Sequence, residues 1–228
     1  MPLNQSHRTG RPTIIATAQQ IRKTGHVATV MMGLLALSLV AGGCTGLQTS
    51  PVQTPDTHVL VTRPITKGAG PKRDLVLDVG AVRAWPGFDT PQMAYVRRPY
   101  ELDYFATAQW ADTPARMLGP LLAQALEQAG SFRAVVQTPS SVPADLRVNT
   151  ELIRLQQNFG TRPSHVEFAL RVQLVDVRAK RILASRLFEE DEIAPTDDAY
   201  GGVTAANVAL QRLLEQLAAF CAAESGAQ

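Results

Sequence analysis

The sequence predicts an α+β domain: a mostly antiparallel sheet of about seven strands with two amphipathic helices packed on one face. Two segments, 114–129 and 199–223, carry apolar residues at helical spacing. Three long segments, 145–159, 165–177 and 182–192, alternate apolar and polar residues between short turns. That alternation is typical of an antiparallel meander with one apolar face and one solvent-exposed face. Helices can cover the apolar face.

Short strands are predicted for the first part of the domain. His58 to Thr62 is a short β-rich run, and 74–83 alternates as a half-buried strand does. Segments 92–97 and 100–105 flank Arg98-Pro99 and indicate a hairpin, because proline cannot donate to a central ladder.

The first helix has clear boundaries. Asp112 or Thr113 can cap its start, Pro114 suits its first turn, and Gly130 is a typical C-cap residue. A strand is predicted next, at Phe132–Gln137.

The final helix follows the meander. Asp197 or Asp198 can cap it, and it is expected to run to about Ala223. Gly201-Gly202 lies at its start without the lysine of a phosphate-binding loop, so we expect the pair to permit close packing.

An export signal is predicted at the N-terminus. Arg22 and Lys23 precede the apolar run Val27–Ala41, and Gly42-Gly43-Cys44 follows, as in a secretory signal peptide. A cysteine directly after small residues resembles a bacterial lipoprotein signal, whose cysteine becomes lipidated. A transmembrane anchor is the alternative, but the run is shorter than the about 20 residues that a span needs.

These patterns divide the chain into four expected regions. They are a lipoprotein signal peptide (1–43), lipidated Cys44 with a flexible tether (44–57), a single α+β domain (58–223) and a disordered tail (224–228). By resemblance to lipoprotein sorting, Thr45 in place of an aspartate implies the outer membrane of a Gram-negative bacterium, facing the periplasm. Without the four cations of the leader, the net charge of +2 becomes −2, which does not favour nucleic-acid binding.

The sequence shows little chemistry. Cys221 is expected to be a buried structural thiol, and His58 and His165 are too isolated to indicate a metal site. The acidic run 189–192 is interpreted as a solvated face, with a cation site or docking patch as the alternative. No hydrolase or metalloprotease motif is present, so we expect no catalytic residue, no metal and no cofactor.

Five aromatic residues gather within 16 positions and are the candidate residues for binding a partner or a lipid: Tyr95, Tyr100, Tyr104, Phe105 and Trp110. They are consistent with core and cross-strand packing. The alternative is an exposed aromatic patch for a partner protein or an acyl chain.

The run Tyr100 to Pro114 (YELDYFATAQWADTP) resembles the strand-to-helix signature of the ABC-type transport auxiliary lipoproteins. That signature is a tyrosine-rich strand and a tryptophan, then a proline that opens an amphipathic helix. The segments that follow are also similar in order, so the resemblance covers about 58–221. One departure is the opening His58-Val59-Leu60, where the family often has Tyr-x-Leu.

The resemblance implies a non-enzymatic accessory lipoprotein of an ABC/MCE-type lipid transport system, docking its periplasmic component to the outer membrane. The implied partners are an MCE-domain periplasmic protein, the ABC permease and ATPase, and the membrane itself. Phospholipid binding and homo-oligomerisation are left open. The alternatives are a structural or assembly lipoprotein, which predicts a polar docking face and no apolar cavity, and a periplasmic hydrolase, which lacks a nucleophile-base pair.

Lipidation at Cys44 is directly testable. Cys44→Ser is expected to release the protein from membranes and to abolish incorporation of labelled palmitate, because the acyl chains supply the anchor. Membrane fractionation and labelling measure this, and Cys221→Ser is the matched control. Continued membrane fractionation of Cys44→Ser would argue against lipidation.

Overall fold

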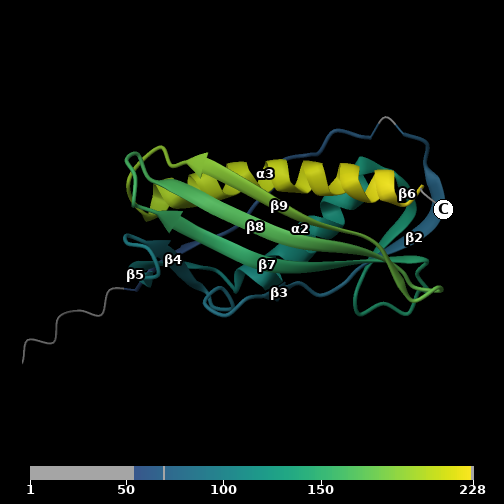
Figure 1. The fold of residues 1–228 in the computed structure, drawn as a ribbon, viewed down its shortest axis with the longest axis horizontal. Helices are drawn as coiled ribbons and strands as arrows, with labels where there is room; N and C mark the ends of the chain where they lie inside the picture. The colour runs from purple at the N-terminus through teal and green to yellow at the C-terminus, as the bar shows by residue number, and fades with distance from the viewer. Residues whose placement is uncertain (1–53, 69, 227–228) are drawn as a thin grey trace, which may run out of the picture. The chain divides into compact units, whose positions relative to one another are not determined.

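The computed structural model describes residues 54–68 and 70–226 (Figure 1). It confirms the α+β class: a mixed, mostly antiparallel sheet with two helices, α2 (Pro114–Ala129) and α3 (Ala199–Glu224). The sheet has nine strands in the described residues, more than the expected seven: β1 (Asp56–His58), β2 (Arg73–Val79), β3 (Arg83–Ala84), β4 (Gln92–Val96), β5 (Leu102–Trp110), β6 (Phe132–Gln137), β7 (Leu146–Asn158), β8 (His165–Asp176) and β9 (Arg181–Ile193).

Strand β7 is shared by the whole sheet. Along one edge it pairs with β8 in an antiparallel ladder, and β8 pairs in the same way with β9, which gives the predicted meander. Along its other edge it pairs in parallel with β2, β3 and β4, one after another. Beyond β2 lies β6, and beyond β4 lie β5 and then β1. Two short groups of strands therefore extend from the two halves of one long strand.

Both helices begin at predicted caps. The Thr113 hydroxyl accepts a hydrogen bond from the backbone N–H of Arg116, and Gly130 ends α2 with a φ of 68°. The Asp198 carboxylate accepts from the N–H of Gly201 at 2.7 Å and is the cap of α3. Each cap satisfies an N–H that the first helical turn leaves without a partner.

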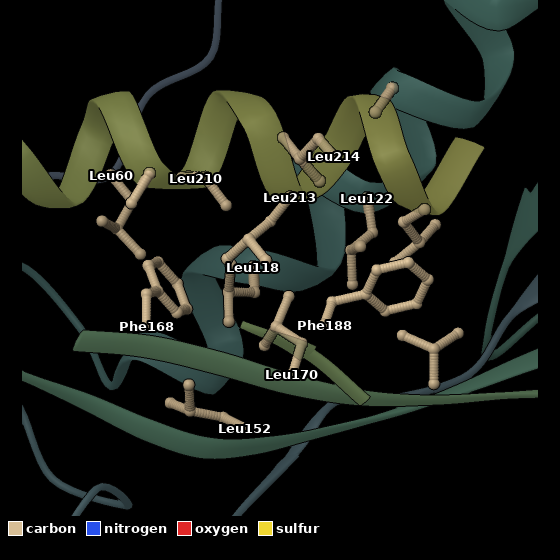
Figure 2. Packing of buried hydrophobic residues seen from close by; sticks show 14 of the residues in the cluster. Leu60, Leu118, Leu122, Leu152, Phe168, Leu170, Phe188, Leu210, Leu213 and Leu214 are labelled. Carbon is tan, nitrogen blue, oxygen red and sulfur yellow. The ribbon is translucent and has the colours of Figure 1, made fainter. Parts of the chain in front are cut away.

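The core lies between the helices and one face of the strands. Figure 2 shows leucines of α3, among them Leu210 and Leu213, facing Phe168 and Leu170 of β8, with Leu118 of α2 in the same layer. All five side chains are at most 1% exposed. The two amphipathic helices thus bury their apolar sides in a single cluster, as predicted.

The glycine pair at the start of α3 allows the close approach that the sequence predicts. A Cβ atom on Gly202 would lie 2.2 Å from Oε1 of Gln157 in β7. A Cβ atom on Gly201 would lie 2.0 Å from the backbone oxygen of Thr196. A side chain at position 202 would therefore press against β7, and one at position 201 would clash with the turn before α3.

The predicted strand at 58–62 is wrong beyond His58. Residues 59–65, here called the strap, lie outside the sheet and bind side chains of both helices. The backbone N–H groups of Val61 and Arg63 donate to the side-chain oxygens of Asn207 and Gln211 in α3, at 2.7 and 2.9 Å. Two residues of extended chain advance about 6 Å, and so do four residues of an α-helix. Side-chain amides at positions i and i+4 of a helix can therefore accept from every second N–H group of an extended chain, as a partner strand would.

Three predicted boundaries also differ from the structure. Strand β1 begins at Asp56, inside the expected tether of 44–57, and α3 continues to Glu224, inside the expected tail of 224–228. The predicted strand 74–83 ends at Val79, because the chain leaves β6 there and pairs again with β7 only at β3. The predicted signal peptide and Cys44 lie outside the described residues.

Neither helix of the described ranges 54–68 and 70–226 is long and apolar enough to span a membrane.

Polar side chains pair on the face of the meander that points away from the helices. Glu167 of β8 accepts hydrogen bonds from Asn158 Nδ2 at 2.8 Å and Gln156 Nε2 at 3.0 Å, and lies 3.2 Å from Arg154 Nη1. Partial burial raises the pKa of Glu167, but these hydrogen bonds and the charge of Arg154 lower it by more, so the net pKa is below its ordinary value.

The Glu167 network makes stability depend on pH. A lowered pKa means that the folded state favours the carboxylate, so this stabilisation is present above the unfolded pKa and is lost as the pH falls through the folded pKa. We expect Glu167→Gln to reduce the unfolding free energy by about 1 kcal/mol at neutral pH, with the difference shrinking in acid. Urea unfolding at several pH values measures this, with exposed Glu189→Gln on β9 as the control. A deficit that does not change with pH would contradict the assignment.

Candidate functional site

Four side chains form a cluster at the β4–β5 hairpin. The Tyr95 and Phe105 rings are 4.8 Å apart, and the Phe159 ring lies 5.8 Å from Tyr95 and 6.2 Å from Phe105. The guanidinium of Arg97 lies 5.2 Å from the Tyr95 ring centroid and 5.5 Å from that of Phe159. We call these four residues the hairpin cluster. Its rings are half-buried and Arg97 is exposed, so the cluster presents both an apolar surface and a cation.

The structure separates the five aromatic residues proposed from the sequence. Only Tyr95 and Phe105 are brought into contact. Trp110 is 4% exposed and belongs to the core, and the hydroxyl of half-buried Tyr104 donates to the backbone oxygen of Gly87 at 3.0 Å. Tyr100 stands apart in the turn and is fully exposed.

Phe159 and Arg97 were not among the predicted site residues. Phe159 directly follows β7, and it reaches Tyr95 because β4 pairs in parallel with the end of β7. Since no local pattern reveals a pairing between strands about 60 residues apart, the sequence carries no signal for this contact.

Tyr100 occupies an unusual position at the hairpin turn. Its φ is 68°, in the left-handed region that a bulky residue rarely adopts. The same turn holds an ion pair between Arg98 Nε and Glu101 Oε2 at 2.7 Å. A fully exposed aromatic side chain on a strained residue gains nothing from core packing, so it is a candidate for contact with another molecule.

The acidic run 189–192 is not simply a solvated face. Because strand side chains alternate, Glu190 and Glu192 of β9 point toward α3, where both pair with Arg212, the Glu190 contact being 2.6 Å. Asp191 points to the other face, 3.5 Å from His165 Nε2. The run therefore helps to hold α3 against the sheet.

Reactive groups are few in the described part of the chain. Burial raises the pKa of the Cys221 thiol to about 12, which keeps it protonated and inert, as expected of a structural thiol. Within residues 54–68 and 70–226, no three histidine, cysteine or acidic residues gather in a way that could hold a metal ion.

A groove lies beside α3, on the side away from the sheet. Its volume is about 360 Å³. The strap forms one wall with Val61 and Arg63, and α3 forms the rest with side chains that include Tyr200, Val208 and Arg212. The groove is a second candidate site, and it contains none of the aromatic residues proposed from the sequence.

Comparison with known proteins identifies the family. Residues 58–218 match the model of the ABC-type transport auxiliary lipoprotein component, so the chain belongs to that family. It is therefore a lipoprotein that serves as an auxiliary component of an ABC-type transport system, which confirms the resemblance seen in the sequence. No curated protein is similar enough to match.

Solved structures share the fold at low sequence identity. The protein XCC0632 from Xanthomonas campestris is 20% identical, with a TM-score of 0.69 over 74% of this chain and 95% of its own. An uncharacterized protein is 15% identical, with a TM-score of 0.57 over 76% and 99%. The hypothetical protein CT253 from Chlamydia trachomatis is 10% identical, with a TM-score of 0.50 over 68% and 100%. At these identities the likeness supports the fold alone.

Burial of Trp110 gives a stability prediction. Trp110→Ala is expected to lower the unfolding free energy by about 3–5 kcal/mol, because it leaves a cavity where β5 meets the core. Denaturant unfolding measures this, with Trp85→Ala, whose side chain is 45% exposed, as the matched control. An unchanged midpoint for Trp110→Ala would refute its place in the core.

Proposed function

We propose that this lipoprotein is a non-enzymatic accessory subunit of an ABC/MCE-type lipid transport system. In this role it docks an MCE-domain periplasmic protein to the outer membrane, where a lipid on Cys44 anchors it facing the periplasm. The ABC permease and ATPase complete the system. Family membership supports the transport role.

The observation that carries the docking role is the hairpin surface. Tyr100 is fully exposed, Leu102 beside it is 36% exposed, and the hairpin cluster places Arg97 over two aromatic rings. Tyrosine and arginine are enriched among the residues that carry most of the binding energy at protein interfaces. The rings of the cluster are already packed, so binding orders few additional side chains.

The titration behaviour of the domain supports a role without catalysis. Shifted pKa values mark many active sites, but here they belong to structural groups. The hydrogen bond from the Gly201 amide lowers the pKa of Asp198, which caps α3. The hydrogen bond from the Ser164 amide similarly lowers the pKa of Asp197 in the adjoining turn. Both of these carboxylates thus serve a backbone N–H group.

The groove beside α3 bears on the alternative role. An assembly lipoprotein that does not handle lipid predicts a polar docking face and no apolar cavity. The wall residues Val61, Tyr200 and Val208 make the groove partly apolar, which favours a protein that meets lipid.

The docking proposal is tested by recovering the anchored protein from its own membranes and identifying co-purifying proteins and lipids by mass spectrometry. We expect an MCE-domain protein in the wild-type sample and about tenfold less of it with Tyr100→Ala and Arg97→Ala combined. Val142→Ala in the β6–β7 turn, also exposed, is the control. Recovery of envelope-assembly proteins without an MCE-domain protein would overturn the proposal.

A further inference from the structure

Exposed apolar side chains gather where the strap crosses α3. Val59 and Val61 of the strap are 50% and 53% exposed, and Tyr200 and Val208 of α3 are 69% and 37% exposed. Three of the four line the groove. Val59 lies beside them, because its carbonyl oxygen accepts a hydrogen bond from Asn207 Nδ2 at 3.3 Å. We call these four residues the strap patch. Soluble proteins seldom leave such a group exposed unless it binds something.

Positive charge accompanies the strap patch. Residues 57–73 contain Arg63, Lys67, Lys72 and Arg73 and no acidic residue. Arg63 is exposed at the wall of the groove. The other cation of the groove, Arg212, is already balanced by two carboxylates of β9. Arg63 is therefore the cation that the strap contributes to the groove, and it suits a negatively charged partner.

The strap patch also follows the expected lipidation site, Cys44, closely in the sequence. Strand β1 is fixed to β5 through His58 opposite Trp110, and the strap begins at the next residue. The ring of His58 is 6.3 Å from that of Tyr200. Nine residues lie between Cys44 and Thr54, where the described chain begins, so the two can be at most about 35 Å apart. A lipid on Cys44 therefore keeps this surface within reach of the bilayer.

We propose that the strap patch rests on the phospholipid surface of the membrane that holds the anchor. This rests on the lipoprotein membership of the chain and on lipidation at Cys44. Valine and tyrosine side chains enter the interfacial region, where a tyrosine ring can bury its body and keep its hydroxyl hydrated. Arg63 at the wall of the groove meets anionic headgroups. An acyl anchor, an apolar patch and a basic segment then act together, and their combination orients the domain as well as holding it.

The native cysteines suit a probe experiment on the full lipidated chain. Cys221 is fully buried, with a pKa of about 12, and should not react with a maleimide. The chain without an added cysteine serves as the blank, since lipidation consumes Cys44. A blank that becomes labelled would reveal failed lipidation, which is distinct from failure of the strap patch. Thr204→Cys places the probe in the groove, and Val142→Cys places it in an exposed turn as the control.

Each labelled chain carries an environment-sensitive fluorophore and is reconstituted in vesicles of phosphatidylethanolamine and phosphatidylglycerol. We expect the fluorescence of the Thr204→Cys probe to be about threefold higher than that of the Val142→Cys probe. The reason is that the fluorophore at position 204 moves from water into the membrane interface. Val61→Ser with Tyr200→Ser should remove this difference. Arg63→Glu changes an exposed side chain outside the core and should reduce the difference only in vesicles that contain phosphatidylglycerol.

The same samples distinguish a membrane surface from two other ligands of the strap patch, a single lipid molecule and a second copy of the chain. Equal emission from both probes would overturn the proposal. So would an equal rise with monomeric short-chain phosphatidylglycerol, which would make the groove a site for a single lipid. A rise that depends on the protein-to-lipid ratio would instead indicate contact with a second copy of the chain and would also overturn it. None of these outcomes requires the MCE-domain partner, so this experiment tests the strap patch independently of the docking proposal.

Discussion

The rest of the structure depends on the backbone pairing of β7. This strand of 13 residues holds β8 along one edge and three shorter parallel strands along the other. Its apolar side chains, such as Val148 and Leu152, are fully buried beneath the helices. A strand with two occupied edges and one buried face cannot slip by a residue, since that would turn its apolar side chains to water. Register fixed at β7 therefore positions the β4–β5 hairpin at one end and β6 at the other.

Helix α3 is the second organising element, and it is held on three sides. Its apolar side packs on β8 and β9, and its Arg212 pairs with Glu190 and Glu192. The side-chain amides of Asn207 and Gln211 bind the strap. These side chains accept hydrogen bonds from backbone N–H groups of the strap, which would otherwise need a partner strand or water. The strap also carries the chain from β1 along α3. The protein thereby places an apolar and basic segment on a rigid support.

The two surfaces suit different roles in an accessory lipoprotein. The hairpin surface offers packed rings, Arg97 and a protruding Tyr100, which are features of a protein interface. The strap patch places apolar side chains next to the exposed cation of Arg63, which suits the proposed membrane contact. The proposed bridging of a membrane and a periplasmic partner would use both surfaces and would need no catalytic group. The inert Cys221 and the structural use of the shifted carboxylates agree with this division.

Local chemistry by itself determined the helices, their caps and the meander, because periodicity, capping residues and turns act within about ten residues. The sequence thus predicted Thr113 and Asp198 as caps, the close packing at Gly202, and the family through the run 100–114. Contacts between distant segments were decided only by the tertiary structure. Parallel pairing of β4 with β7 brings Tyr95 into contact with Phe159. Residues 59–62 bind side-chain amides of α3 and do not pair with a strand of the sheet. Both depend on which distant elements become neighbours, and that choice is made by burial of the whole core.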